Sequence, residues 1–342
     1  MPGVFIATAK VLSKPSACKY WTAITLSVLA GCSSISGNVD VAGYAALAPV
    51  QSLDNVAFFP QIEDQCGPAS LATVLATQGV DVTAEALRGK LYIPGKEGAV
   101  TTEMVARARR YGMLAYILEP RLYDVLAEID AGHPVLVMQN LGFAWLPRWH
   151  FSVAIGFDLN EETIELRSGE VFTHEIDFGL FLKTWRRAQS WAMVALPAGI
   201  LPATAKPLKT LNAANDLEQV GETAAALSVY KSITGRWPST AEAYFGAGNS
   251  AYALGEYHAS QQFFSSYLHQ RPMAAAGWNN LAYSLAALSC GPQALQAIAC
   301  AIQSAPADHA LKHSQAEINT MVQSTTASDE CPKLDCPFGE NQ

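Results

Sequence analysis

The chain has 342 residues, half of them hydrophobic, and a formal net charge of −8. This length suits two domains, each able to bury a core of its own. No basic patch is present to neutralise phosphates, so the composition argues against nucleic acid as a partner.

Residues 1–31 form a basic and then apolar leader with three lysines and no acidic residue. Its apolar stretch, from Trp21 to Gly31, is too short for a stable membrane-spanning helix, which needs about 20 residues. We therefore interpret the segment as an export signal. Its removal would take the net charge from −8 to −11.

The leader ends in Leu29-Ala30-Gly31-Cys32. Small residues before a cysteine in this setting resemble the lipobox of bacterial lipoproteins. The resemblance implies cleavage before Cys32 and acyl chains on its sulfur and new amino group, which anchor more firmly than one chain alone. Ser33 in place of an acid implies sorting to the outer membrane, facing the periplasm. The alternative is an ordinary secretory leader with an incidental cysteine.

Residues 32–55 are expected to form a flexible tether, because residues 38–55 are rich in Gly, Ala, Ser and Asn. After the tether comes Cys66. Gly67-Pro68 predicts a turn, and the apolar run behind it predicts a buried helix that stops at Gly79. At a helix N-terminus the dipole and unpaired N–H groups favour the reactive thiolate. The alternative is a small buried hydrophobe.

Further elements follow from hydrophobic spacing, caps and turn residues. The expected helices are 83–88 capped by Thr83, 103–111 capped by Thr101 or Thr102, 123–131 and 178–186. The expected strands are 135–139, 150–157, 163–166, 171–176 and 190–196.

A strand that opens with His150 can place a base beside Cys66, as in papain-like sites. Residues 58–197 resemble the papain-like peptidases that cleave double-glycine leaders from bacteriocin precursors. The resemblance is carried by Gln61 with Cys66-Gly67, by 132–137, and by His150-Phe151 with 156–158. It implies an α+β papain-like fold and an oxyanion-hole role for Gln61, with Gln65 as a weaker candidate.

The third catalytic member of that family is an Asp or Asn on the strand after the histidine. Here the matching stretch, 165–169, has no carboxylate in register. Ser168 or a backbone carbonyl is the expected partner of the imidazole, and Asp158 in the preceding turn is the other candidate.

The sequence shows no metal-ligand spacing and no phosphate-binding loop, so we expect neither a metal nor a cofactor.

From residue 207 the pattern changes to a 34-residue period, marked by Pro238, Pro272 and Pro306. Small residues recur in the same frame, as at Ala213 and Ala247. This resembles the tetratricopeptide repeat, a helix pair that is stable only when stacked. The alternative is a plain helical bundle. Residues 308–322 are expected to cap the array.

Cys331 and Cys336 could close a small loop in an oxidising periplasm, and Cys290 and Cys300 are expected to be buried thiols. Spacing alone leaves the pairing open. The expected organisation is a leader at 1–31, a tether at 32–55, a peptidase-like domain at 56–198, repeats at 207–238, 241–272 and 275–306 within a unit ending at 322, and a polar tail at 323–342.

Two functions remain open from the sequence. The first is a lipid-anchored cysteine peptidase with Cys66, His150 and Gln61 in the site and repeats that bind a protein partner or substrate. The second is a non-catalytic adaptor that keeps the fold and binds peptides or envelope components.

Overall fold

The computed structural model describes residues 41–61, 65–91, 100–323 and 331–337. The leader and Cys32 lie outside these residues. Within the described ranges, none of the helices combines the length and the apolar character needed to traverse a bilayer.

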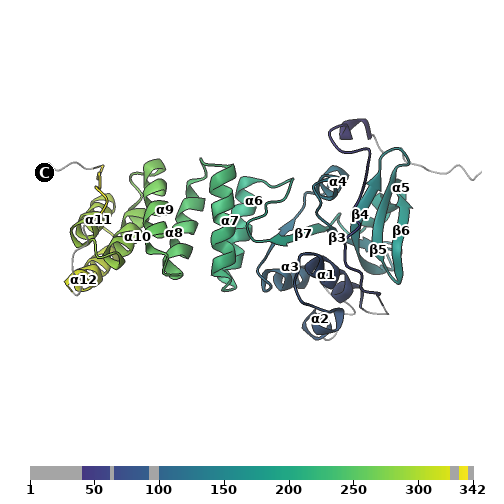
Figure 1. Ribbon diagram of the computed structural model, residues 1–342, viewed down its shortest axis with the longest axis horizontal. Helices are drawn as coiled ribbons and strands as arrows, with labels where there is room; N and C mark the ends of the chain where they lie inside the picture. Colours follow the sequence, from purple (N-terminus) through teal and green to yellow (C-terminus); the bar gives the residue numbers. More distant parts are fainter. Residues whose placement is uncertain (1–40, 62–64, 92–99, 324–330, 338–342) are drawn as a thin grey trace, which may run out of the picture. The chain divides into compact units, whose positions relative to one another are not determined.

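The first half of the described chain is an α+β domain built around an antiparallel sheet (Figure 1). The strand order is β2-β7-β3-β4-β5-β6, with β1 paired to β4. The strands are β1 (Val50–Ser52), β2 (Met113–Ile117), β3 (Val135–Asn140), β4 (Trp149–Asp158), β5 (Thr163–Ser168), β6 (Val171–Asp177) and β7 (Ala192–Pro197). The helices are η1 (Val41–Tyr44, 3-10), α1 (Cys66–Thr77), α2 (Ala84–Leu91), α3 (Thr101–Arg109), α4 (Leu122–Asp130) and α5 (Phe178–Arg186).

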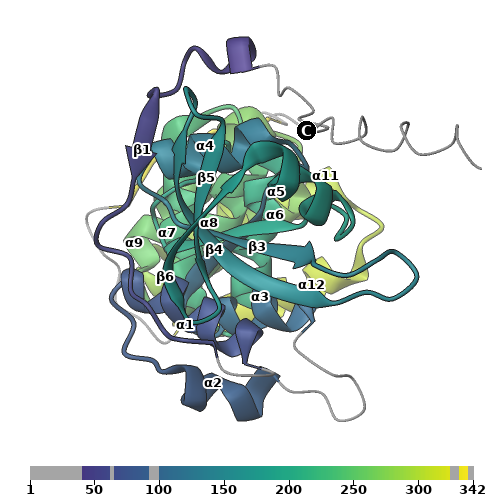
Figure 2. The ribbon, with the colours of Figure 1, turned by 90° about the vertical axis from the view of Figure 1, so that its right-hand side faces the viewer.

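Two hydrophobic cores flank this sheet, because successive strand residues point to opposite faces. On β4, Phe151, Val153 and Ile155 join the core that includes residues of α1, α2 and α3. Ala154 joins the other core, which includes residues of α4 and α5. Phe157 joins that core as well, because the strand register shifts between Ala154 and Gly156. Figure 2 shows the sheet from the side of β1 and β6. The sheet therefore separates the Cys66 helix from α4 and α5.

Helix α1 starts at Cys66 itself, so the predicted helix N-terminus is correct. The predicted turn at Gly67-Pro68 is wrong, because both residues lie in the first turn of the helix. Proline is tolerated there, since the N–H that it lacks would have no intrahelical acceptor. The helix ends at Thr77, and Gly79 follows with φ +83°.

Two strands were not predicted from the sequence. Strand β2 is buried at four of its five positions, so its sequence lacks the alternation that marks a half-exposed strand. Strand β1 lies within the predicted flexible tether and pairs with β4 from Val50 to Ser52. The tether prediction is therefore wrong for this segment. The predicted caps Thr101 and Thr102 are also inside α3, which starts at Thr101.

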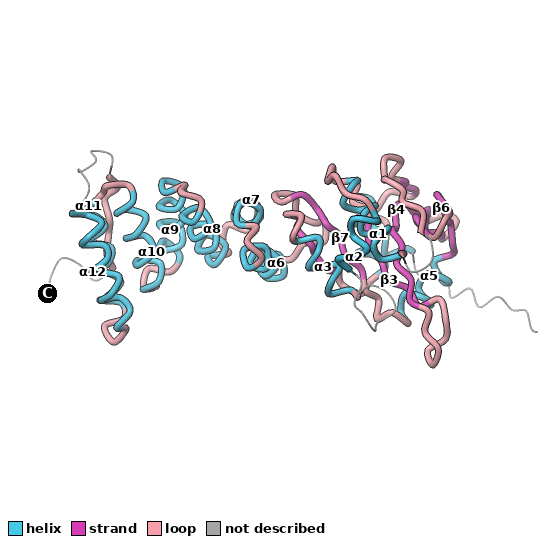
Figure 3. The backbone as a smooth tube through the Cα atoms, turned by 90° about the horizontal axis from the view of Figure 1, so that it is seen from below, coloured by secondary structure: helices cyan, strands magenta, loops and turns pink. Residues whose placement is uncertain are grey.

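The second half is an all-helical repeat region resembling tetratricopeptide repeats (Figure 3). Its helices are α6 (Pro207–Gln219), α7 (Thr223–Arg236), α8 (Ala241–Ala253), α9 (Tyr257–Gln270), α10 (Ala275–Ala287), α11 (Gly291–Ser304) and α12 (His309–Gln323). The first helices of successive pairs start at 207, 241 and 275, and α12 starts at 309, so the 34-residue period is confirmed. Helix α12 packs on α10 and α11 at the predicted capping position.

The first repeat packs against the α+β domain through buried contacts. Leu114 of β2 belongs to the core of α6 and α7. Arg109 pairs with Asp216 at 2.6 Å. The buried carboxylate of Glu128 accepts bonds from the backbone N–H groups of Ala203 and Thr204, at 3.1 and 2.8 Å.

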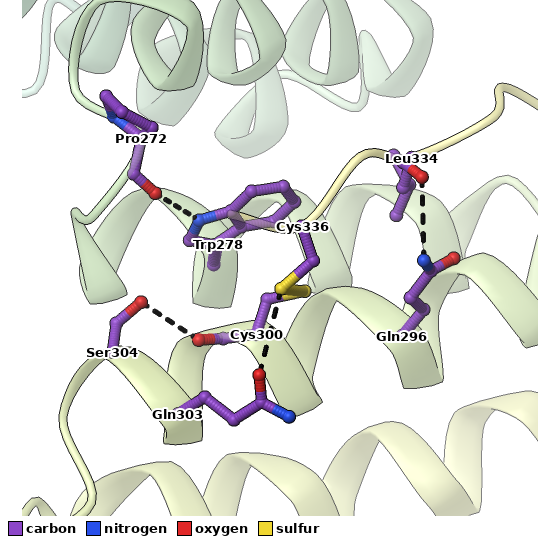
Figure 4. The surroundings of a disulfide bond; sticks show 8 residues. All are labelled: Pro272, Trp278, Gln296, Cys300, Gln303, Ser304, Leu334 and Cys336. Carbon is purple, nitrogen blue, oxygen red and sulfur yellow. Dashed lines mark hydrogen bonds between the residues drawn. A yellow bond between two sulfur atoms is a disulfide. The ribbon is translucent and has the colours of Figure 1, made fainter. Parts of the chain in front are cut away.

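The cysteine pairing differs from the prediction. Cys290 is bonded to Cys331 and Cys300 to Cys336, so the expected small loop between Cys331 and Cys336 is wrong, and the repeat cysteines are not thiols. Figure 4 shows the tail segment running over α11, where the Gln296 side chain donates to the Leu334 carbonyl at 3.5 Å. The tail is thereby attached to the last repeat at two points.

The repeat packing depends on glycines at helix contacts. A Cβ on Gly246 would lie 2.5 Å from the ring of Tyr230, which is buried. We expect Gly246→Ala to destabilise the protein by about 1–3 kcal/mol through overpacking. Gly235→Ala, on the same array with nothing within 4 Å of its Cβ, should be neutral or stabilising by up to ~1 kcal/mol. Thermal melting of both variants checks this, and equal melting temperatures would contradict it.

Candidate active site

Cys66 lies at the first position of α1, half-buried and packed against the core that contains Phe151. Among the described cysteines, it alone is outside a disulfide. The first four N–H groups of a helix have no intrahelical acceptor, and the helix dipole is positive at that end. Both effects favour negative charge at the sulfur and beside it.

Gln61 connects the Cys66 helix to two strands. Its side-chain nitrogen donates to the Ser70 hydroxyl of α1 at 2.9 Å and to the Phe151 carbonyl of β4 at 3.2 Å. Its side-chain oxygen accepts from the Gly169 N–H at 3.1 Å, and its own backbone N–H donates to the Gly169 carbonyl at 2.9 Å. The first turn of α1 is thus tied to the residue after His150 and to the turn after β5.

The imidazole of His150 has a specific partner. Its Nε2 lies 2.8 Å from the Ser168 hydroxyl at the end of β5. The Asp158 carboxylate instead accepts from the backbone N–H groups of Asn160 and Glu161, at 2.7 and 3.1 Å. Of the candidates from the sequence, Ser168 is the one in contact with the imidazole. Nδ1 is then the ring nitrogen left to exchange a proton with a thiol.

His150 is neutral at ordinary pH. Burial, with repulsion from Arg148 and from His174, lowers the pKa of His150 from 6.5 to about 4. A neutral imidazole can accept a proton, which is the property required of a general base. Serine carries no charge, so Ser168 orients the ring without raising its pKa as a carboxylate would.

The amide orientation of Gln61 follows from its neighbours. The Phe151 carbonyl can only accept and the Gly169 N–H can only donate, so the amide nitrogen must face Phe151 and its oxygen Gly169. Both N–H bonds of the amide are then engaged with protein groups. An oxyanion role for Gln61 requires the release of one of them. Gln65, the weaker candidate, supplies the backbone carbonyl that accepts from the Ala69 N–H.

Sequence reasoning missed Ser70 and Gly169 as parts of this network. Neither residue type suggests catalysis: Ser70 accepts one bond from the Gln61 side chain, and Gly169 exchanges two bonds with Gln61. The spacing of Ser70 four residues after Cys66, on one face of the same helix, is the signal that could have identified it. Gly169 follows Ser168 directly and could have been found with it.

The first half of the chain is similar to a known family. Residues 53–192 match the family described as Peptidase_C39 like family. These residues form a C39-like cysteine peptidase domain. The matched range holds Cys66, His150, Gln61 and Ser168. None of the curated proteins compared with the chain matches it.

Solved structures resemble the two halves separately. A putative C39-like peptidase from Bacillus anthracis is 18% identical, covering 44% of this chain and 98% of its own, with a TM-score of 0.38. A double glycine motif protease from an AMS/PCAT transporter, in complex with its leader peptide, is 22% identical over 43% of this chain and 94% of its own, with a TM-score of 0.35. The first TPR of Spaghetti bound to an HSP90 peptide is 12% identical over 35% of this chain and 94% of its own, with a TM-score of 0.33.

The contact between His150 and Ser168 allows a test of whether Ser168 or Asp158 is the third catalytic residue. We expect Ser168→Ala to lower kcat by about threefold to tenfold, corresponding to the ~0.5–1.5 kcal/mol of one neutral hydrogen bond, with little change in KM. Asp158→Ala, which removes only turn contacts, should leave kcat near its original value. Steady-state kinetics on a peptide substrate measure both. A larger loss with Asp158→Ala would contradict the assignment.

The lowered pKa of His150 predicts a pH dependence. The neutral base persists down to about pH 4, so the acid limb that His150 imposes on kcat/KM should lie near pH 4 and not near 6.5. Arg148→Gln removes one cause of the lowered His150 pKa and should move the acid limb of kcat/KM toward pH 6.5. Arg88→Gln, an exposed arginine on α2, is the matched control. NMR titration of the His150 ring in Cys66→Ala measures the same pKa directly, and an ordinary value of 6.5 would contradict the prediction.

The same shift affects stability with a defined sign. Between pH 6.5 and about 4 the unfolded chain binds a proton at His150 that the folded chain does not bind. The stability contributed by neutral His150 is therefore complete above 6.5 and is lost as the pH falls through about 4.

Proposed function

We propose that this chain is a lipid-anchored periplasmic cysteine peptidase whose repeats bind a protein partner or the substrate. The observation that carries the proposal is the pairing of two features within the C39-like domain. Cys66 occupies the first turn of a helix packed on β4, and β4 carries a neutral His150 oriented by Ser168.

The proposed reaction follows from these groups. The Cys66 thiol transfers its proton to Nδ1 of His150, and its sulfur attacks the carbonyl carbon of a peptide bond. The backbone N–H of Cys66, with Gln61 once it releases a protein acceptor, donates to the oxyanion. The imidazolium then protonates the departing amine, which leaves a thioester on Cys66. Water hydrolyses the thioester with His150 as base, which frees the acid product and restores the thiol.

A peptide substrate fits the family match. The structure of the double glycine motif protease holds a leader peptide, and a peptide is also the substrate class we propose here. The 34-residue helix pairs supply a second binding region. The side chain of Asn280 donates to that of Asn249 at 2.8 Å, and Tyr252 lies against Tyr257 and Tyr283. The polar and aromatic set Asn249, Tyr252, Asn280 and Tyr283, on the first helices α8 and α10, is our candidate for contact with an extended peptide.

The anchor rests on the resemblance of Leu29-Ala30-Gly31-Cys32 to a lipobox. We expect acylated Cys32 to hold the protein on the outer membrane, facing the periplasm. Cys32→Ser should lose acylation and leave the membrane fraction. Unchanged membrane association of that variant would contradict the anchor without affecting the proposed chemistry.

The second candidate function is a non-catalytic peptide-binding adaptor with the same fold. Two observations favour it: among the residues that the structure describes, the hydrogen-bond partner of the imidazole is the Ser168 hydroxyl and no carboxylate or carboxamide, and both amide N–H bonds of Gln61 are already engaged. An adaptor needs a peptide-binding surface and the fold but no thiolate.

Thiol reactivity separates these two functions. For the peptidase we expect an iodoacetamide probe to label Cys66 at pH 6 faster than a free thiol, whose pKa is about 8.5. His150→Ala should slow the labelling, because it removes the neutral base that takes the thiol proton as the sulfur reacts. Cys66→Ala should abolish the labelling and lower peptide hydrolysis by a factor on the order of 10³ or more. Labelling at the rate of a free thiol, unaffected by His150→Ala, would support the adaptor.

A further inference from the structure

The connection between β3 and β4 carries a dense group of exposed apolar side chains. We use the name β3–β4 loop for residues 141–149, which are the connection 141–148 and Trp149, the first residue of β4. Figure 2 shows the connection extending away from the sheet. It holds five of the sixteen exposed large hydrophobic side chains in the described part of the chain, namely Leu141, Phe143, Trp145, Leu146 and Trp149. Trp145 is 79% exposed, and its ring stacks on that of Phe143 with centroids 5.7 Å apart.

Several backbone groups of the loop are hydrogen-bonded within it. The Asn140 side-chain oxygen accepts from the N–H groups of Gly142 and Arg148, both at 2.9 Å. Phe143 and Leu146 exchange backbone bonds of 3.0 and 3.2 Å. A Cβ on Gly142 would collide with the Leu146 carbonyl, so the close turn requires glycine. The free-energy cost of moving a polar group out of water is much lower when the group is hydrogen-bonded within the protein than when it is unpaired.

The surroundings of the loop are basic although the whole chain is acidic. Arg187, just after α5, donates to the Gly142 carbonyl at 2.5 Å, which places the end of α5 against the loop. Arg148, Lys183 and Arg186 are exposed. Neither residues 140–151 nor residues 178–191 contain an aspartate or glutamate, whereas the chain carries a net charge of −8.

We propose that the β3–β4 loop inserts its apolar side chains into the headgroup region of an anionic lipid bilayer. Tryptophan and phenylalanine favour that region, and neighbouring lysines and arginines attract anionic headgroups. If an apolar peptide bound to this surface, it would explain the exposed aromatic side chains. It would not explain why the charged side chains nearby are basic, with no aspartate or glutamate among them. Because Trp149 precedes His150, the contact holds the candidate active site close to the membrane surface. The proposal depends neither on catalysis nor on acylation of Cys32.

Tryptophan quenching locates the loop. The full-length chain is bound to vesicles of 30% phosphatidylglycerol in phosphatidylcholine that contain a phosphatidylcholine with a nitroxide near the headgroup. We expect quenching of a part of the tryptophan emission. Trp145→Phe keeps an aromatic side chain and removes the reporter, so the quenched part should fall. Trp237→Phe, directly after α7, removes a tryptophan elsewhere and should leave the quenched part unchanged.

Two further measurements test the electrostatic attraction between the basic side chains and anionic lipid. The quenching that Trp145 contributes should fall at least twofold in Lys183→Glu/Arg186→Glu, and also on vesicles of phosphatidylcholine alone. Equal quenching in Trp145→Phe and in the unaltered chain would overturn the proposal. A second pair of results would also overturn it: Trp145 shows no quenching in the unaltered chain, and the Phe143→Ser/Trp145→Ser variant has a raised KM for a soluble peptide. Together these results would mean that the loop binds substrate. Neither result depends on whether Cys66 is the nucleophile.

Discussion

The side-chain amide of Gln61 joins three segments that are far apart in the sequence. Its two donors reach α1 and β4, and its acceptor receives the N–H of the turn after β5. Only one orientation of the amide satisfies all three neighbours, so the network fixes the position of the first turn of α1 relative to β4. Cys66 begins that turn and His150 precedes the bonded residue of β4. The candidate site therefore depends on a residue that need not touch a substrate.

Two features of the site favour the neutral form of the His150 imidazole. Burial lowers the pKa of His150, and its partner Ser168 offers a hydroxyl where a carboxylate would stabilise the imidazolium. A resting thiolate–imidazolium pair is disfavoured under these conditions. The helix N-terminus acts in the opposite direction on Cys66, because it stabilises the thiolate. In the proposed mechanism, the proton transfer from Cys66 to His150 would therefore be a step that substrate binding can promote by changing the solvation of the two groups.

Much of this architecture was predictable because it has a local signature. The helices of the repeats start at the predicted positions, since the 34-residue period and the prolines mark each pair. Strands β3 to β6 alternate or end in turn residues and were predicted within a few residues. Strand β2 is buried on both faces and has no alternation, and β1 is defined by its pairing with β4, which no local pattern encodes.

The site was predictable in its residue types but not in its contacts. Ser168 reaches His150 beside an irregularity in the pairing of β5 with β6, between Leu166 and Ser168, and such a shift changes which way a strand residue points. The disulfide pairing likewise could not be predicted from the local sequence. It depends on the path of the tail over α11, so the short spacing between Cys331 and Cys336 was misleading.

The junction between the two halves determines how the repeats can influence the site. Glu128 is fully buried, and although burial alone would raise its pKa, hydrogen bonds from His133 and Thr204 lower it. The carboxylate therefore stays charged at neutral pH and keeps its bonds to the segment that leads into α6. Removing one partner from a buried charge is costly, so the connection resists opening. Leu114 of the sheet also lies in the core of α6 and α7. The proposed partner of the repeats would therefore bind next to β2, which is connected through β7 and β3 to the strand of His150.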